Sequence, residues 1–186
     1  LESRSRLGIG ANSIKSPEIY LNDMRLIKSD FEINRMREAV QISAEAHELV
    51  RQTISTKSNE RQIQGILEGF FLEKGARGPA YNSIVASGDN ACILHYTSNN
   101  SELNRGDLLL VDAGCSLSDY YNGDITRTIP IGGKFSEEQK ILYEIVLDAQ
   151  KNAIKSAVKG SNSSKVHFVA LKILVEGLKE IGLLRG

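Results

Sequence analysis

The pattern of apolar and polar residues predicts helices toward both ends of the chain and short strands in its middle. Ser29 and Glu32 have the spacing of a capping box and predict the start of a long helix. Its apolar residues recur near one helical face: Met36, Val40, Ala44, His47, Val50 and Ile54. A second helix is predicted between Ser58, as its cap, and Gly75, as its stop, with an apolar face of Ile63, Ile66, Leu67, Phe70 and Phe71.

Four short runs with strand-like composition follow, separated by segments rich in Gly, Asn, Asp and Ser. They cover residues 81–85, 90–96, 108–111 and 124–131. Ser136 and Gln139 then repeat the capping-box spacing and predict a helix that ends near Gly160, with Ile141, Leu142, Ile145, Val146, Ala149 and Ile154 facing inward. The last helix is predicted from about Ser164 to Leu178, with an apolar face of Val166, Val169, Ile173, Leu174 and Leu178.

This order of elements predicts an α+β domain, in which a mainly antiparallel sheet has helices packed on one face. Residues 1–28 are polar and show no sustained period, although 19–21 could form a short strand. We interpret 1–28 as a linker or the tail of a preceding domain. Because the first residue is Leu and not Met, we expect the chain to be a piece of a longer protein.

Composition narrows the classes of function. Twenty-three basic residues balance twenty-three acidic ones, so we expect neither nucleic acid nor an anionic membrane as a partner. No apolar run approaches the roughly 18 residues that span a bilayer. Two cysteines, Cys92 and Cys115, are too few for a secreted disulfide framework, and we read both as reduced and the protein as cytoplasmic.

Two aspartates carry the candidate chemistry. Asp112 directly follows the aliphatic run 108–111, where a buried carboxylate needs an arginine, a hydrogen-bond donor or a metal ion. Asp124 opens an alternating run in which it shares a face with Thr126 and Thr128. If the two strands form a hairpin, both carboxylates lie on one face, so that one pKa is raised or a divalent metal sits between them. Alternatively, Asp112 ends its strand at a turn and Asp124 pairs with Arg127; spacing alone leaves both open.

Several motifs, in order along residues 30–186, resemble the aminopeptidase P and prolidase (Xaa-Pro peptidase) family. The segment from Leu108 through Asp112, Gly114 and Asp124 to Phe135 resembles the family's first metal-binding hairpin. The segments 81–88 and 90–96 resemble the one that carries its substrate histidine, and 139–150 and 175–178 also fit. Asp112 and Asp124 are one residue further apart than in many members, so we expect a longer loop or a bulge to keep both on one face.

The resemblance implies a metallopeptidase with the pita-bread fold, in which two related α+β halves hold two divalent ions, manganese first and cobalt or zinc as alternatives. It implies metal-ligand roles for Asp112 and Asp124, with Asp124 bridging the ions. It places His95 beside the scissile peptide as a catalytic residue, Tyr81 near the metals and Thr126 behind the aspartates. The expected substrate is a peptide with proline second. His47 and His167 match no functional position and are read as structural.

The remaining ligands of the family, one histidine and two glutamates, belong to a C-terminal half that would follow residue 186. We therefore expect residues 29–186 to be the first half of the catalytic domain, inactive and at most a weak metal binder alone, with an open sheet edge that a second copy could cover as a homodimer. Two alternatives remain: a methionine aminopeptidase, and a non-catalytic peptide-binding module on the same fold. Retention of Asp112, Asp124 and His95 favours the proline-directed peptidase.

Overall fold

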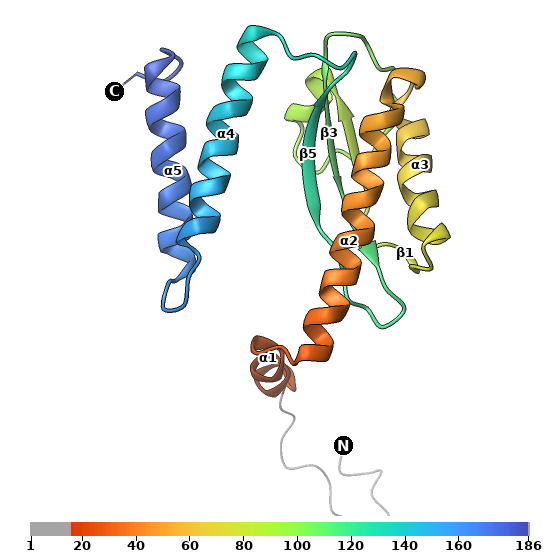
Figure 1. The fold of residues 1–186 in the computed structure, drawn as a ribbon, viewed down its shortest axis with the longest axis vertical. Coiled ribbons are helices and arrows are strands. Elements are labelled where there is room, and N and C mark those ends of the chain that lie inside the picture. The colour runs from red at the N-terminus through yellow and green to blue at the C-terminus, as the bar shows by residue number, and fades with distance from the viewer. Residues whose placement is uncertain (1–15, 186) are drawn as a thin grey trace, which may run out of the picture.

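The computed structural model describes residues 16–185, so most of the predicted linker lies outside the described residues. Figure 1 shows its central sheet, flanked by one pair of helices and followed by a second pair. The helices are α1 (Glu18–Leu26), α2 (Asp30–Thr53), α3 (Glu60–Glu73), α4 (Glu137–Ser156) and α5 (Ser163–Glu180). The strands are β1 (Gly78–Pro79), β2 (Ile84–Ser87), β3 (Leu108–Ala113), β4 (Cys115–Ser116) and β5 (Ile125–Pro130), and short 3-10 helices cover Ile54–Thr56 and Gly88–Cys92.

The main sheet has the order β2-β3-β5, and both pairings are antiparallel. Alternation along β3 buries Leu109, Val111 and Ala113 and leaves the residues between them half-buried. The buried side faces α2 and α3, which cover one face of the sheet (Figure 1), and their apolar side chains form one core with it. The predicted antiparallel sheet with helices on one face is therefore confirmed, and Asp112 lies on the other face.

Helix α2 begins as predicted, because Ser29 and Glu32 form both bonds of the capping box. Its buried face differs from the prediction and consists of Ala39, Ile42, Ser43, Ala46, His47 and Val50. Met36 and Val40, which belong to the predicted apolar face, are 39% and 46% exposed and lie outside the buried face. Val40 lies about 100° around the helix from Ala39, which turns it away from the sheet.

Helix α3 is capped by Asn59 and not by Ser58. The Asn59 side chain accepts a hydrogen bond from the backbone N–H of Arg61 at 2.8 Å, while the Ser58 N–H itself donates to Gln62. The helix ends at Glu73 with Lys74 as its C-cap, and the predicted stop, Gly75, follows with a φ of +82°, which suits a residue without a side chain. Its buried residues are Glu60, Ile63, Leu67 and Phe71, so the apolar face was largely correct.

The predicted strand at 90–96 is wrong. Gly88–Cys92 forms a 3-10 helix, and His95 follows in the left-handed region with φ +56°. The first predicted strand, 81–85, lies instead at Ile84–Ser87. The apolar residues between 90 and 96 resemble a strand in composition, but the chain leaves the sheet after Ser87, where β2 ends.

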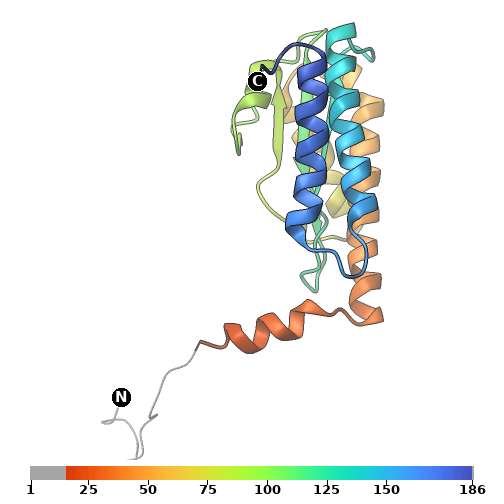
Figure 2. The same ribbon diagram turned by 90° about the vertical axis from the view of Figure 1, so that its left-hand side faces the viewer.

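The possible strand at 19–21 is also wrong, because Glu18–Leu26 is helix α1. Glu18 in its first turn and Arg25 in its last have the charges that favour helix ends. None of its residues is buried, and in both ribbon views α1 extends beyond the end of α2, away from the sheet (Figures 1 and 2).

Helices α4 and α5 form an antiparallel pair beside the sheet (Figures 1 and 2). Ser136 and Gln139 cap α4 as predicted, and Asn162 caps α5. The inward face predicted for α4 is only partly correct, because Ala149 is buried while Ile141, Leu142, Val146 and Ile154 are exposed. The apolar face predicted for α5 is half-buried. A Cβ at Gly177 would lie 2.7 Å from Ile145, so this glycine permits close contact between the two helices.

Candidate metal centre

The two predicted aspartates meet on the open face of the sheet. Asp112 lies opposite Thr126 in the β3-β5 ladder, and Asp124 immediately precedes β5. The hydroxyl of Tyr81 donates to Asp112 Oδ1 at 2.6 Å and to Asp124 Oδ1 at 2.9 Å. The extra residue between the aspartates therefore does not separate them; the loop that joins their strands contains Tyr120 with φ +69°.

Tyr81 is the shared hydrogen-bond donor of this pair. Burial raises the pKa of its hydroxyl, and the hydrogen bonds to the two carboxylates raise it further. The hydroxyl thus keeps its proton and donates at neutral pH. The carboxylates of Asp112 and Asp124 share this neutral donor but have no cationic partner. No Lys or Arg within residues 16–185 forms an ion pair with either aspartate.

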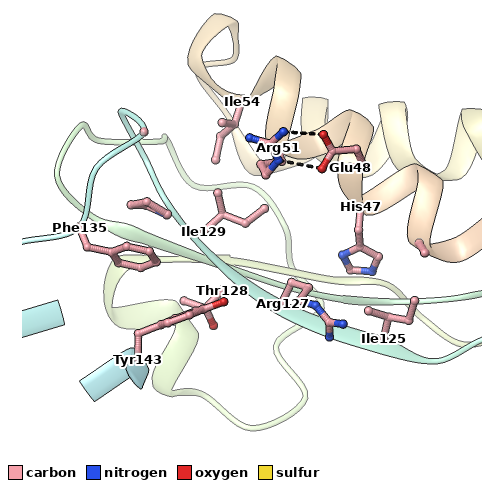
Figure 3. Close-up of a pocket in the computed structure, with 13 residues that line it drawn as sticks. His47, Glu48, Arg51, Ile54, Ile125, Arg127, Thr128, Ile129, Phe135 and Tyr143 are labelled. Carbon is pink, nitrogen blue, oxygen red and sulfur yellow. Dashed lines mark hydrogen bonds and ion pairs between the residues drawn. The ribbon is translucent and has the colours of Figure 1, made fainter. Parts of the chain in front are cut away.

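Arg127 does not serve as the partner of Asp124. Its guanidinium donates to the neighbouring carbonyl of Thr126 at 2.8 Å, and it lines a cleft of about 410 Å³ between α2 and β5. Figure 3 shows this cleft, with His47 directed from α2 toward β5 and the Glu48–Arg51 pair above it. The alternative in which Asp124 pairs with Arg127 is therefore wrong.

His47 is structural, as predicted. It is 5% exposed, and its Nε2 lies 3.1 Å from the carbonyl oxygen of Ala113. Burial lowers the pKa of the imidazole, which favours the neutral ring with Nε2–H as donor. His167, the fifth residue of α5, is exposed and does not line the hollow that contains the two aspartates.

His95 faces the same hollow as the aspartates. A cavity of about 390 Å³ is lined by Tyr81, Asn82, Ile84, His95, Thr97, Asp112 and Asp124. A neighbouring hollow of about 280 Å³ shares Asp112 and His95 and adds Thr126. Thr126 is exposed, and within the described chain no hydrogen bond joins its hydroxyl to an aspartate. All five predicted site residues thus surround two adjoining hollows.

Two glycines and a serine, none of them predicted as site residues from the sequence, fix the backbone beside the aspartates. A Cβ at Gly123 would lie 2.2 Å from Ser43 Oγ, and one at Gly114 would lie 1.9 Å from the carbonyl oxygen of Gly123. Ser43 Oγ accepts from the Cys115 N–H at 3.0 Å, and the Gly123 N–H donates to the Cys115 carbonyl at 2.9 Å. Gly114 and Gly123, each within two positions of an aspartate, were the sequence signal from which this tight backbone packing could have been inferred.

The donor set fits a divalent cation but is small. Carboxylate oxygens suit hard divalent ions, and the excess negative charge favours one here. In the described part of the chain, however, no group of three or more His, Cys, Asp or Glu side chains has the arrangement of a metal site. Asp112 and Asp124 could hold a metal only together with ligands from elsewhere.

Comparison with known proteins defines the class. The chain matches the description "Metallopeptidase family M24" over residues 34–184 and belongs to that family. It is 48% identical to the Xaa-Pro aminopeptidase of Haemophilus influenzae over 166 residues, and 41% identical to that of Escherichia coli. These alignments cover 89% of this chain but 38% and 37% of those proteins, so the chain spans less than two fifths of their length.

Solved structures agree with this assignment. Aminopeptidase P from E. coli with the inhibitor Pro-Leu superposes with a TM-score of 0.88 at 40% identity, covering 91% of this chain and 38% of that one. Pseudomonas aeruginosa aminopeptidase PepP superposes with a TM-score of 0.85 at 42% identity, covering 91% and 38%. The α+β fold described above is therefore part of the aminopeptidase P fold.

Proposed function

We propose that this chain is the N-terminal part of the catalytic domain of an Xaa-Pro aminopeptidase, which hydrolyses the bond between an N-terminal residue and proline. The observation that carries the proposal is the convergence of Asp112, Asp124 and Tyr81, with His95 on the same hollow. The names of the similar proteins support the proline-directed substrate. Residues 29–186 would form this half-domain, and 1–28 would join it to a preceding part.

Each residue has a role that follows from its chemistry. Asp112 and Asp124 would hold two divalent ions together with ligands outside this chain, and manganese is the first candidate, before cobalt or zinc. When bound, such a pair activates water and stabilises the negative charge that develops on the attacked carbonyl. Tyr81 would orient both carboxylates through its hydroxyl, and Thr126 would border the site. His95 would contact the substrate next to the scissile bond, as a hydrogen-bond donor or acid.

The cellular setting is part of the proposal. The two cysteines are free, which is consistent with a cytoplasmic protein. None of the helices in the described residues has the length and apolarity needed to cross a bilayer. The peptide substrate is the proposed partner, and a homodimer would be compatible with the open face of the sheet.

The test is an assay of the complete protein that contains this chain. Release of the N-terminal residue from an Xaa-Pro-Xaa tripeptide should require manganese, and Asp112→Asn or Asp124→Asn should abolish it. Asp23→Asn, which removes a carboxylate on the exposed helix α1, is the matched control and should leave the rate unchanged. No manganese-dependent release by the unmodified protein would refute the proposal.

The same assay, together with a calorimetric titration, separates the alternatives. A methionine aminopeptidase would release methionine from a Met-Ala peptide and leave the Xaa-Pro peptide intact. A non-catalytic binding module would bind the Xaa-Pro peptide in a calorimetric titration without cleaving it. We expect cleavage of the Xaa-Pro peptide only.

A further inference from the structure

Glu60, in the first turn of α3, is a buried carboxylate for which the proposed chemistry has no use. None of its surface is exposed, and no Lys or Arg among residues 16–185 pairs with it. Burial alone would raise the pKa of this carboxyl, but hydrogen bonds from Ser101, Ser87 and Asn90 outweigh burial and lower it. Burying a charge without a counter-ion costs free energy unless several hydrogen-bond donors surround it. The groups that donate to Glu60 therefore indicate which part of the chain this side chain holds in place.

Those donors are spread along one segment, 87–101, and include both of its ends. Oε1 accepts from the Ser87 N–H and hydroxyl, both at 2.8 Å, and from the Asn90 amide at 3.1 Å. Oε2 accepts from the Tyr96 hydroxyl and the Ser101 N–H, both at 2.9 Å. A single side chain on α3 thus ties together the beginning and the end of a segment that leaves the sheet after β2.

His95 lies between these anchors, next to Tyr96. Its φ of +56° is a conformation that residues other than glycine adopt only at a cost, and its side chain is exposed on the candidate site. Such a conformation persists when the surrounding structure over-determines it. Glu60 accepts hydrogen bonds from Asn90 and Tyr96, which lie on either side of residues 91–95, and these bonds restrict the conformation of that stretch.

We propose that Glu60 is a positioning residue for His95: its buried carboxylate holds segment 87–101 so that the imidazole stays over the hollow that contains Asp112 and Asp124. The part of this inference that concerns His95 rests on the proposed function. The anchoring of segment 87–101 by Glu60 does not depend on it. Glu60 itself lines neither of the two hollows and acts only through the segment that it anchors.

Glu60→Gln in the complete protein tests the mechanical role. The amide keeps the shape of the side chain, but its NH₂ group must face a backbone N–H donor, of Ser87 or of Ser101. Hydrogen exchange of the amides in 87–101 should therefore become about tenfold faster. Glu73→Gln makes the same charge change at the exposed end of α3 and should leave exchange in this segment unchanged. Unchanged exchange in Glu60→Gln would overturn the proposal.

A double-variant comparison tests whether the effect passes through His95. Glu60→Gln should lower kcat/KM on the Xaa-Pro tripeptide about tenfold when His95 is present, and little in a His95→Ala background, at equal metal content. Equal loss in both backgrounds would overturn the proposal, because Glu60 would then act elsewhere.

The two ideas fail in different ways. If the complete protein does not cleave the peptide, the proposed function fails, and the exchange measurement alone decides whether Glu60 holds the segment. If Glu60→Gln does not fold, Tyr96→Phe removes one of the five donors and should speed exchange in 87–101 by a smaller factor. Unchanged exchange in that variant would count against Glu60 as the anchor.

Discussion

The hydroxyl of Tyr81 donates to Asp112 across 2.6 Å, from the segment before β2 to the end of β3. The same hydroxyl also donates to Asp124, so one neutral phenol connects two carboxylates that form no ion pair with a Lys or Arg among residues 16–185. In the absence of metal, this donor is what reduces the repulsion between them.

Tyr81→Phe should therefore destabilise the metal-free chain by about 1 kcal/mol, the typical net value of such a hydrogen bond. Urea unfolding in the presence of a chelator measures the change. Tyr20→Phe, on the exposed surface of α1, is the control and should have no effect. A Tyr81→Phe variant as stable as the parent would show that the phenol does not relieve the repulsion.

Gly123→Ala should destabilise the fold by about 1–3 kcal/mol, because the new methyl group would meet Ser43 Oγ at 2.2 Å. Gly69→Ala is a matched control on α3, where a Cβ meets nothing within 4 Å, and should stabilise by about 0.5–1 kcal/mol. Thermal unfolding of both variants is the measurement. Equal stability of Gly123→Ala and the parent would mean that Ser43 on α2 can move away from the new methyl group without a cost in free energy.

The buried Glu60 carboxylate should make the free energy of unfolding fall as the pH is lowered into the acidic range. Its pKa is lowered in the folded state, so its contribution is fully present above the unfolded value of about 4.3 and is lost as pH falls through the folded value. The difference in unfolding free energy between the parent and Glu60→Gln should therefore be largest near pH 7 and shrink below about pH 4.3. Urea titrations at pH 7 and pH 3.5 measure it; a difference that grows in acid would contradict the assigned direction.

Residues 1–186 alone should bind manganese weakly, because two carboxylates cannot complete a dinuclear site. Elemental analysis after dialysis should find less than one ion per chain, while the complete protein retains up to two. Asp112→Asn should lower the residual binding, and Asp23→Asn should not. Two tightly held ions per isolated chain would contradict this expectation.

The sequence by itself determined the elements whose signals are local. Capping boxes at Ser29 and Ser136 begin helices as predicted, because a cap depends on residues only three positions apart. The aliphatic run 108–111 predicted a strand, and it lies within β3; Asp112, which follows that run, accepts a hydrogen bond from Tyr81 on the open face of the sheet.

The tertiary structure decided what depends on distant partners. Glu60 accepts hydrogen bonds from Ser87, Asn90 and Ser101, which lie 27 to 41 positions away in the sequence. Between Ser87 and Ser101 the apparent strand is a 3-10 helix, followed by His95 with φ +56°, and no local pattern predicts these distant bonds. The sheet on which α2 packs determines that Ala39 and not Val40 is buried. Only the folded chain brings the Tyr81 hydroxyl within hydrogen-bond distance of both aspartates. These three residues lie in different segments of the chain, so no local sequence pattern predicts that they are in contact.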